Sequence, residues 1–242
     1  MPTFEASLER EKKFVCWLEF VRKDAEEIMI LGDLFDFWFE YQTVVPKGFI
    51  RVLGKLAELR DSGIVITLFS GNHDLWLKDY FPKYLGIPII HQPIVREWFG
   101  KRFYLAHGDG LGPGDLGYKL MNKLFRNRIA QWFFRKTHPD FGIWLANFFS
   151  NTSRNAHLKY DQIDYGEKER LYQFVKQYVT RDNSIDYFIF GHRHLPRNIT
   201  INSNSKMIIL GDWITHFSYL KINEMGVELD YFEKNIHNHL DK

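Results

Sequence analysis

Side chains that can bind metal ions are concentrated in four short motifs of this 242-residue sequence. The candidates are Asp33 in a Gly-Asp pair, Asn72 in GNHD, His107 in a His-Gly pair, and His192 and His194 in GHRH. Carboxylate, amide and imidazole groups are the ligands expected for manganese, iron or zinc rather than for a thiolate site. Two such ions about 3.5–4 Å apart activate a water molecule and neutralise phosphoryl oxygens, which phosphoester hydrolysis requires. The motifs therefore indicate a metal-dependent hydrolase.

Each motif directly follows an apolar run that is typical of a buried strand. The runs cover residues 28–31, 64–69, 102–106 and 187–190. Because the carboxyl ends of the strands form the ligand crevice of an open α/β sheet, strand ends from distant parts of the chain can converge on one site. A single Gly-Asp or GNHD motif is more often a simple turn, so the prediction depends on all four motifs occurring in order.

Taken together and in this order, the motifs resemble the calcineurin-like metallophosphoesterase superfamily. The resemblance implies an α/β fold, a two-sheet α/β/β/α sandwich, with two divalent metal ions, manganese by preference. It implies that Asp33 is the carboxylate that bridges the two ions. Asn72, His107 and His192 would complete the ligands of one ion, and His194 would bind the other.

Two residues of GNHD are candidates for catalysis itself. The resemblance implies that His73 lies near the scissile phosphate, and an Asp–His arrangement with Asp74 can hold an imidazolium ready to protonate a leaving oxygen. The alternative is that His73 only hydrogen-bonds the substrate.

The resemblance extends from about residue 5 to about residue 222, and one motif of the family is absent. The family begins with a strand that ends in Asp-x-His, and no such strand precedes Met1. We therefore expect the first strand to be missing, and with it one carboxylate and one imidazole of the second metal site. An internal methionine taken as the start, or a truncated chain, would account for this.

Hydrophobic periodicity predicts the elements that must position these residues. Helices are expected over residues 7–23, 46–61 and 75–85, and over most of 115–180. Further strands are expected over residues 87–91, 94–99, 197–201, 207–210, 217–222 and 227–232. Strands that alternate with helices, followed by a run of strands, indicate two sheets flanked by helices. We expect one domain over residues 1–242, with a helical insertion over residues 115–165.

The first part of the insertion is basic and aromatic. Between Leu116 and Thr137 there are six lysines or arginines and no acidic residue, and nine aromatic residues lie between Tyr118 and Phe149. Such a segment can lie on an anionic membrane surface or cover a lipid as a lid over the metal site. The alternative is a packed helical hairpin whose basic face is solvated.

Longer stretches narrow the resemblance. GDLFDFWFEY, GNHDLW and AHGDGLGPGDLGYK are similar to the UDP-2,3-diacylglucosamine diphosphatase family, especially its Bacteroidetes-type branch. This resemblance implies cleavage of a UDP-linked diacylated glucosamine into UMP and an acylated sugar phosphate, in lipid A biosynthesis at the cytoplasmic face of the inner membrane. It implies that Asp115, Arg154 and Lys159 contact the substrate. The better-studied branch has arginine where this chain has His73.

Composition sets limits on other classes of function. Apolar residues make up 45% of the chain, so we expect it to fold rather than to be disordered. A net charge of +2 is too mild to argue for a nucleic-acid partner. The single Cys16 excludes an intramolecular disulfide, fits a reducing cytoplasm, and lies in an amphipathic run that predicts burial. No apolar stretch approaches the roughly 20 residues that span a bilayer, so any membrane contact is expected to be peripheral.

Two other functions remain open on the sequence. One is a soluble phosphodiesterase or nucleotide pyrophosphatase with the same metal site. The other is a metal-poor domain that binds a nucleotide or lipid without hydrolysing it. The lipid dependence of turnover separates the first from a lipid A enzyme, and metal stoichiometry identifies the second.

Overall fold

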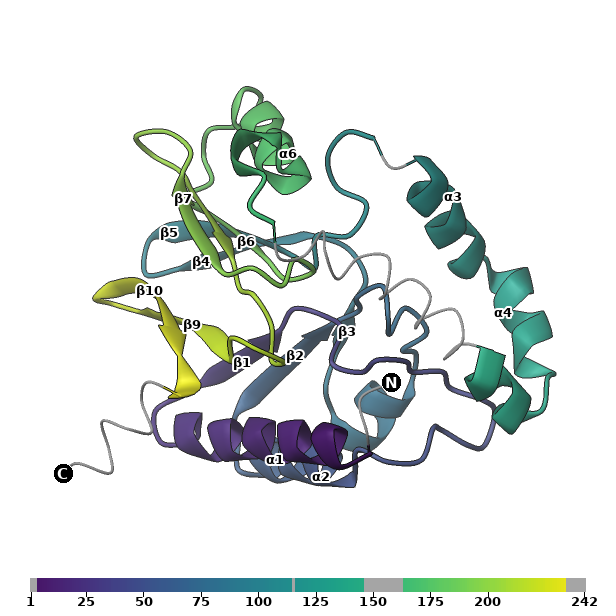
Figure 1. Ribbon diagram of the computed structural model, residues 1–242. Helices are drawn as coiled ribbons and strands as arrows, with labels where there is room; N and C mark the ends of the chain where they lie inside the picture. Colours follow the sequence, from purple (N-terminus) through teal and green to yellow (C-terminus); the bar gives the residue numbers. More distant parts are fainter. Residues whose placement is uncertain (1–3, 115, 146–162, 234–242) are drawn as a thin grey trace. The chain divides into compact units, whose positions relative to one another are not determined.

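The computed structural model describes residues 4–114, 116–145 and 163–233, and Figure 1 traces the chain. The chain packs as two compact units, and each unit is made of two separate stretches of sequence. The first unit comprises Met1–His91 and Leu116–His157, and the second comprises Gln92–Asp115 and Leu158–Lys242. Both units combine strands with helices, so the expected mixed α/β class is confirmed.

A parallel sheet of three strands organises the first unit, in the order β1-β2-β3. The strands are β1 (Glu27–Ile30), β2 (Val65–Phe69) and β3 (Ile89–Ile90). Helices α1 (Phe4–Val21) and α2 (Ile50–Asp61) lie side by side in Figure 1 and contact each other. Helix α2 lies between β1 and β2 in the chain and supplies the crossover that these parallel strands need. The carboxyl ends of the strands all lie at one edge of the sheet, where the first two motifs follow.

The apolar faces of α1 and α2 stabilise this unit. Leu18, Leu56 and Leu59 are each no more than 1% exposed. Full burial of one leucine contributes about 1.5–3 kcal/mol. On the surface, Lys55 lies 2.9 Å from Glu19 and 2.6 Å from Glu58. Exposed ion pairs of this kind contribute at most about 1 kcal/mol, so each buried leucine contributes more to stability than either ion pair.

Two helices are shorter than their sequence patterns predict. Helix α2 begins at Ile50 rather than at residue 46, because Phe49 adopts a left-handed φ of 54°. The helix expected over residues 75–85 is reduced to the π-helical turn η1 (Phe81–Leu85). The buried carboxylate of Glu40 accepts hydrogen bonds from the backbone N–H groups of Lys78, Asp79 and Tyr80, at 2.8–3.0 Å. The carboxylate therefore binds the N–H groups just before η1, and residues 75–79 are not helical.

The expected burial of Cys16 is wrong. The neighbouring Trp17 and Leu18 are the buried residues of this part of α1, at 8% and 0% exposure. With 3.6 residues per turn, Cys16 lies about 200° around the helix from the fully buried Leu18, and it is exposed.

A mixed sheet of five strands organises the second unit, in the order β4-β5-β6-β8-β7. Its strands are β4 (Ile94–Trp98), β5 (Lys101–Ala106), β6 (Tyr187–Phe190), β7 (Arg197–Thr200) and β8 (Lys206–Ile209). The central pairs β5–β6 and β6–β8 are parallel, and the edge strands β4 and β7 pair antiparallel. The ends of β5 and β6 therefore lie together, and the last two motifs follow them.

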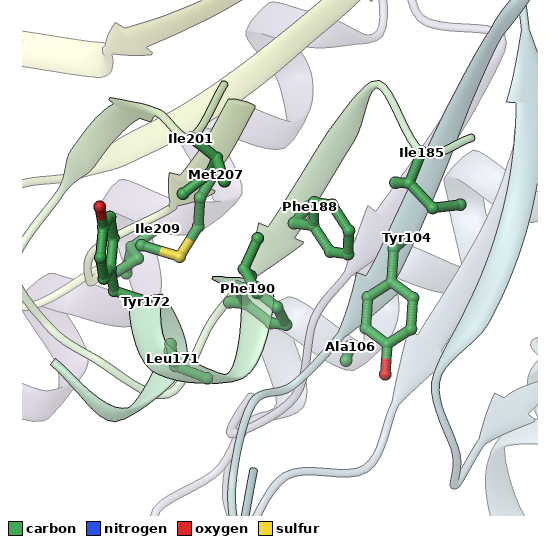
Figure 2. Packing of buried hydrophobic residues seen from close by; sticks show 11 residues of the cluster. Tyr104, Ala106, Leu171, Tyr172, Ile185, Phe188, Phe190, Ile201, Met207 and Ile209 are labelled. Atoms are coloured by element: carbon green, nitrogen blue, oxygen red, sulfur yellow. The ribbon is translucent and has the colours of Figure 1, made fainter. Parts of the chain in front are cut away.

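Helix α6 (Arg170–Val179) covers a face of this sheet and closes its core. Figure 2 shows the buried cluster, which combines side chains of the sheet with Leu171 and Tyr172 of the helix. Burial raises the pKa of Tyr104 to about 12, with a contribution from the neighbouring Tyr178. A short 3-10 turn, η2 (Gly166–Lys168), leads into α6. The strands β9 (Ser218–Asn223) and β10 (Gly226–Tyr231) form a separate antiparallel hairpin, so the described residues hold one small sheet beyond the two expected.

The beginning of the insertion is helical, as predicted. Helix α3 (Leu116–Phe125) is followed by α4 (Arg128–Arg135), whose N-cap Asn127 accepts hydrogen bonds from two backbone N–H groups. No helix in the described part of the chain is both long and apolar enough to cross a membrane. The predicted substrate residues Asp115, Arg154 and Lys159 lie outside the described residues.

Candidate metal centre

In the first unit, the loops after β1 and β2 bring two of the motifs into contact. Asp33 adopts a left-handed φ of 53°, and its Oδ1 accepts a hydrogen bond from the backbone N–H of His73 at 2.8 Å. The backbone of Gly71 runs so close that a Cβ there would lie 2.1 Å from Asp33 Oδ1. Only glycine permits this approach. Asn72 follows in the same loop and is half-buried.

Asp74 holds the two loops together. Its side chain is fully buried, at 0% exposure. Oδ1 accepts from the N–H of Gly71 at 2.6 Å and of Asp33 at 3.3 Å, and Oδ2 accepts from the N–H of Leu34 at 2.9 Å. Hydrogen bonds to a carboxylate are stronger than those between neutral groups. The described contacts of Asp74 therefore place it as a residue that positions Asp33.

The ring of His73 has a defined orientation. Its Nδ1 lies 3.2 Å from the backbone carbonyl oxygen of Asp36. Because a carbonyl only accepts, Nδ1 carries the proton of the neutral ring, and Nε2 is the nitrogen that gains or loses a proton. A ring held in this way can transfer a proton at Nε2.

In the second unit, the loops after β5 and β6 bring two imidazoles together. The ring centroids of His107 and His192 are 5.2 Å apart, and a ring nitrogen of each lies within 4.8 Å of the other. His107 is 5% exposed. His192 adopts a left-handed φ of 57°. Both rings come from strand ends, as predicted, and their spacing suits two ligands of one divalent ion.

A residue that the sequence analysis did not select lies beside His194. The Asp212 carboxylate oxygen Oδ2 lies 4.0 Å from His194 Nδ1, and Oδ1 lies 3.4 Å from His216 Nδ1. Asp212 Oδ1 also accepts from the N–H groups of residues 214–216, at 2.8–3.2 Å. A signal for Asp212 was present, because Gly211-Asp212 follows an apolar strand just as Gly32-Asp33 does.

The predicted ligands thus fall into two groups, and the structure describes each group within its own unit. Asp33, Asn72, His73 and Asp74 belong to the first unit, and His107, His192 and His194 belong to the second. In each unit the motifs follow parallel strands and their loops are in contact. The assignment of all of these residues to one centre stays a prediction.

An aromatic contact anchors the insertion helices to the first unit. The ring of Phe134 lies 4.8 Å from those of both Phe39 and Trp76, measured between centroids. Trp76 Nε1 donates a hydrogen bond to the carbonyl oxygen of Phe125 at 2.7 Å. The Arg135 guanidinium donates to the carbonyl oxygen of Glu40 at 3.1 Å. One side of α4 is therefore fixed.

The remaining surface of α3 and α4 is apolar and basic, and we call it the apolar helix surface. Its apolar members, all more than half exposed, are Leu116, Leu120, Leu124, Ile129, Trp132 and Phe133. Burial lowers the pKa of Lys78, and the positive charges of Arg135 and Arg128 nearby lower it further. Large apolar side chains therefore face solvent close to the positive charges of Arg128 and Arg135. These exposed side chains are what the membrane or lid interpretation expects of the insertion, and the packed hairpin with a solvated basic face stays the alternative.

Comparisons with known proteins agree with the motifs. Residues 9–196 match the family described as calcineurin-like phosphoesterase. A UDP-2,3-diacylglucosamine hydrolase of Porphyromonas gingivalis is 41% identical over 86% of this chain and 84% of its own length. Enzymes of the same description from Pseudomonas fluorescens and Vibrio parahaemolyticus are 30% and 27% identical, over 86% and 88% of this chain and 83% and 89% of their own lengths.

Proposed function

The chain belongs to the calcineurin-like phosphoesterase family, and we propose that it hydrolyses the diphosphate of a UDP-linked diacylated glucosamine. The products would be UMP and the acylated sugar phosphate, a step of lipid A biosynthesis. The 41% identity to a UDP-2,3-diacylglucosamine hydrolase, over most of both chains, is the observation that carries this proposal.

The residues present fit a metal centre. Asp33, Asn72, His107 and His192 would hold one divalent ion, and Asp33 and His194 would supply only part of the ligands of a second, with manganese as the proposed metal. Support comes from the oxygen and imidazole donors, the close approach of Gly71 to Asp33, and the spacing of His107 and His192. The bound ions supply an activated water and neutralise phosphoryl charge.

The chain's own groups then orient and transfer protons. The carbonyl of Asp36 holds the ring of His73, so that Nε2 can donate a proton to the oxygen of the departing phosphate. Asp74 keeps Asp33 in place through the backbone of both loops. Donation of a hydrogen bond to the substrate, without proton transfer, is the second role that His73 can take.

Hydrolysis of the acylated substrate tests this function. With Mn²⁺, UDP-2,3-diacylglucosamine is expected to yield UMP, and a chelator should abolish the reaction until Mn²⁺ is restored. UDP-N-acetylglucosamine is the matched substrate without long acyl chains. Burial of even four methylene groups is worth about 3 kcal/mol, so its kcat/KM should be lower by about 100-fold. Chromatography of the released nucleotide measures both rates.

The other functions predict different results. Equal rates on the two substrates would favour a soluble nucleotide pyrophosphatase. Binding of either substrate without any release of UMP in the presence of Mn²⁺ would favour a domain that does not hydrolyse.

We place the protein peripherally on the cytoplasmic face of the inner membrane, with the apolar helix surface against the lipid. The exposed Ile129, Trp132 and Phe133 would enter the interface, while Lys123 and Arg128 would face anionic headgroups. The same surface would receive the acyl chains of the substrate as a lid.

Vesicle binding tests the apolar helix surface. The double substitution Lys123→Glu and Arg128→Glu should weaken binding to vesicles with 30% phosphatidylglycerol by roughly 30-fold or more, since each cation near the surface is worth about 1 kcal/mol. Added salt should weaken the wild type similarly. Tyr84→Ser removes another exposed aromatic, 67% exposed and part of η1 rather than of α3 or α4, and should leave binding unchanged. Unchanged vesicle affinity in the charge-reversed variant would contradict the placement. Flotation assays measure the affinities.

A further inference from the structure

Arg193 separates the two predicted ligands of GHRH, and it is buried. Only 4% of the residue is exposed. Arginine is almost never fully buried without partners. The burial of Arg193 therefore calls for partners inside the protein.

Among the described residues, three contacts of the guanidinium are made by one short segment. Arg193 Nε lies 3.1 Å from Glu169 Oε2, and Glu169 is itself 6% exposed. An Nη atom of Arg193 donates a hydrogen bond to the carbonyl oxygen of Ile163 at 2.8 Å. The guanidinium carbon lies 5.7 Å from the centre of the Tyr165 ring. Arg193 thus ties the ligand turn to residues 163–169, where the chain enters α6.

The turn that Arg193 holds is strained. The N–H of Arg193 bonds back to the carbonyl oxygen of Gly191 at 2.6 Å, so His192 is the central residue of a three-residue turn with a φ of 57°. Residues other than glycine persist in such a turn only where the surrounding structure holds them. Arg193 directly follows His192, so its buried guanidinium holds the chain one residue away from the strained position.

We propose that the Arg193–Glu169 pair is a positioning device that holds His192 and His194 in the geometry for binding metal. A buried ion pair generally adds little net stability, because desolvation offsets its attraction. Its contribution here is the geometry of the turn. This inference depends on the proposed function in one respect, namely that His192 and His194 are metal ligands.

The test separates positioning from folding with three variants. Arg193→Met leaves the charge of Glu169 buried without its counter-ion, and should lower the melting temperature by roughly 10 °C. Glu169→Gln keeps the Oε1 that accepts from the N–H of Arg170 at the start of α6. The double variant Arg193→Met/Glu169→Gln carries neither charge, so its melting temperature should return to within about 3 °C of the wild type.

Metal binding is the decisive measurement. We expect the double variant to bind Mn²⁺ at least about tenfold more weakly than the wild type, the effect typical of groups that orient ligands. Its kcat should fall while the substrate KM stays within about twofold. Arg197→Met is the matched control, because it removes the nearby surface ion pair with Asp164, and it should leave Mn²⁺ affinity unchanged.

The outcomes are distinguishable. Equal Mn²⁺ affinity in the wild type and the double variant would overturn the positioning role, whatever the substrate. A wild type that binds Mn²⁺ more tightly than the double variant but releases no UMP would contradict the proposed function and support the positioning role.

Discussion

Replacement of Asp33 by alanine is expected to lower kcat/KM for Mn²⁺-dependent hydrolysis by about a thousandfold or more. As a proposed metal ligand, Asp33 would help to hold the divalent ions, so its loss should weaken metal binding. Metal ions contribute several kcal/mol to the transition state, and each 1.4 kcal/mol is a factor of ten in rate. Because the ligands act as a unit, adding Asn72→Ala or His192→Ala should cost little more. Initial rates and bound Mn²⁺ check both statements.

Two further variants control for folding. Asp33→Asn keeps an oxygen that can accept from the N–H of His73, so it should fold normally and still lose activity. Asp36→Asn changes an exposed carboxylate three residues away while keeping the carbonyl that orients His73, and should remain active. Near-normal turnover in Asp33→Ala would exclude this metal centre.

Replacement of Asp74 by alanine should produce the largest loss of stability. Three backbone N–H groups, of Gly71, Asp33 and Leu34, would lose their acceptor. A buried donor left without a partner costs about 1–3 kcal/mol, so we expect the free energy of unfolding to fall by about 3–5 kcal/mol. The two loops would also separate, so metal binding should weaken. Urea unfolding measures the first effect.

Asp79→Ala is the control for Asp74→Ala. Asp79 is an exposed carboxylate five residues further along the chain, and its loss should change stability by no more than about 0.5 kcal/mol. A variant of Asp74 that is as stable as the wild type, yet turns over slowly, would show that Asp74 contacts the reacting groups.

The strands were the most predictable part of the fold. The run over residues 187–190 was expected as a strand and is β6 with the same bounds. Every other expected strand is present, with ends displaced by at most two residues. Short apolar runs bounded by turn residues are local signals, so the sequence contains them directly. The motifs could be placed at strand ends for the same reason.

Contacts between distant residues were not predictable. Glu40 accepts hydrogen bonds from the backbone N–H groups of residues 78–80, where a helix was expected over residues 75–85 and only η1 forms. The sequence offered Asp74 as a partner for His73, and it gave no sign of the hydrogen bonds by which Asp74 also joins the backbone of the loop around Asp33. Nothing near Arg193 in the sequence indicates its contact with Glu169. Hydrophobic periodicity indicates which face of a helix or strand is buried, but it does not identify the polar groups that this face contacts.

The left-handed backbone at Asp33 and His192 has a consequence for transplanting this chemistry into other scaffolds. The two φ angles, 53° and 57°, determine where the side chains of Asp33 and His192 point, and this matters as much as which residues they are. If only the sequences Gly-Asp or GHRH were copied onto an ordinary strand–helix connection, the metal-ligand atoms would point in other directions. What must be transferred is a set of turns, together with the buried groups that keep each turn from relaxing.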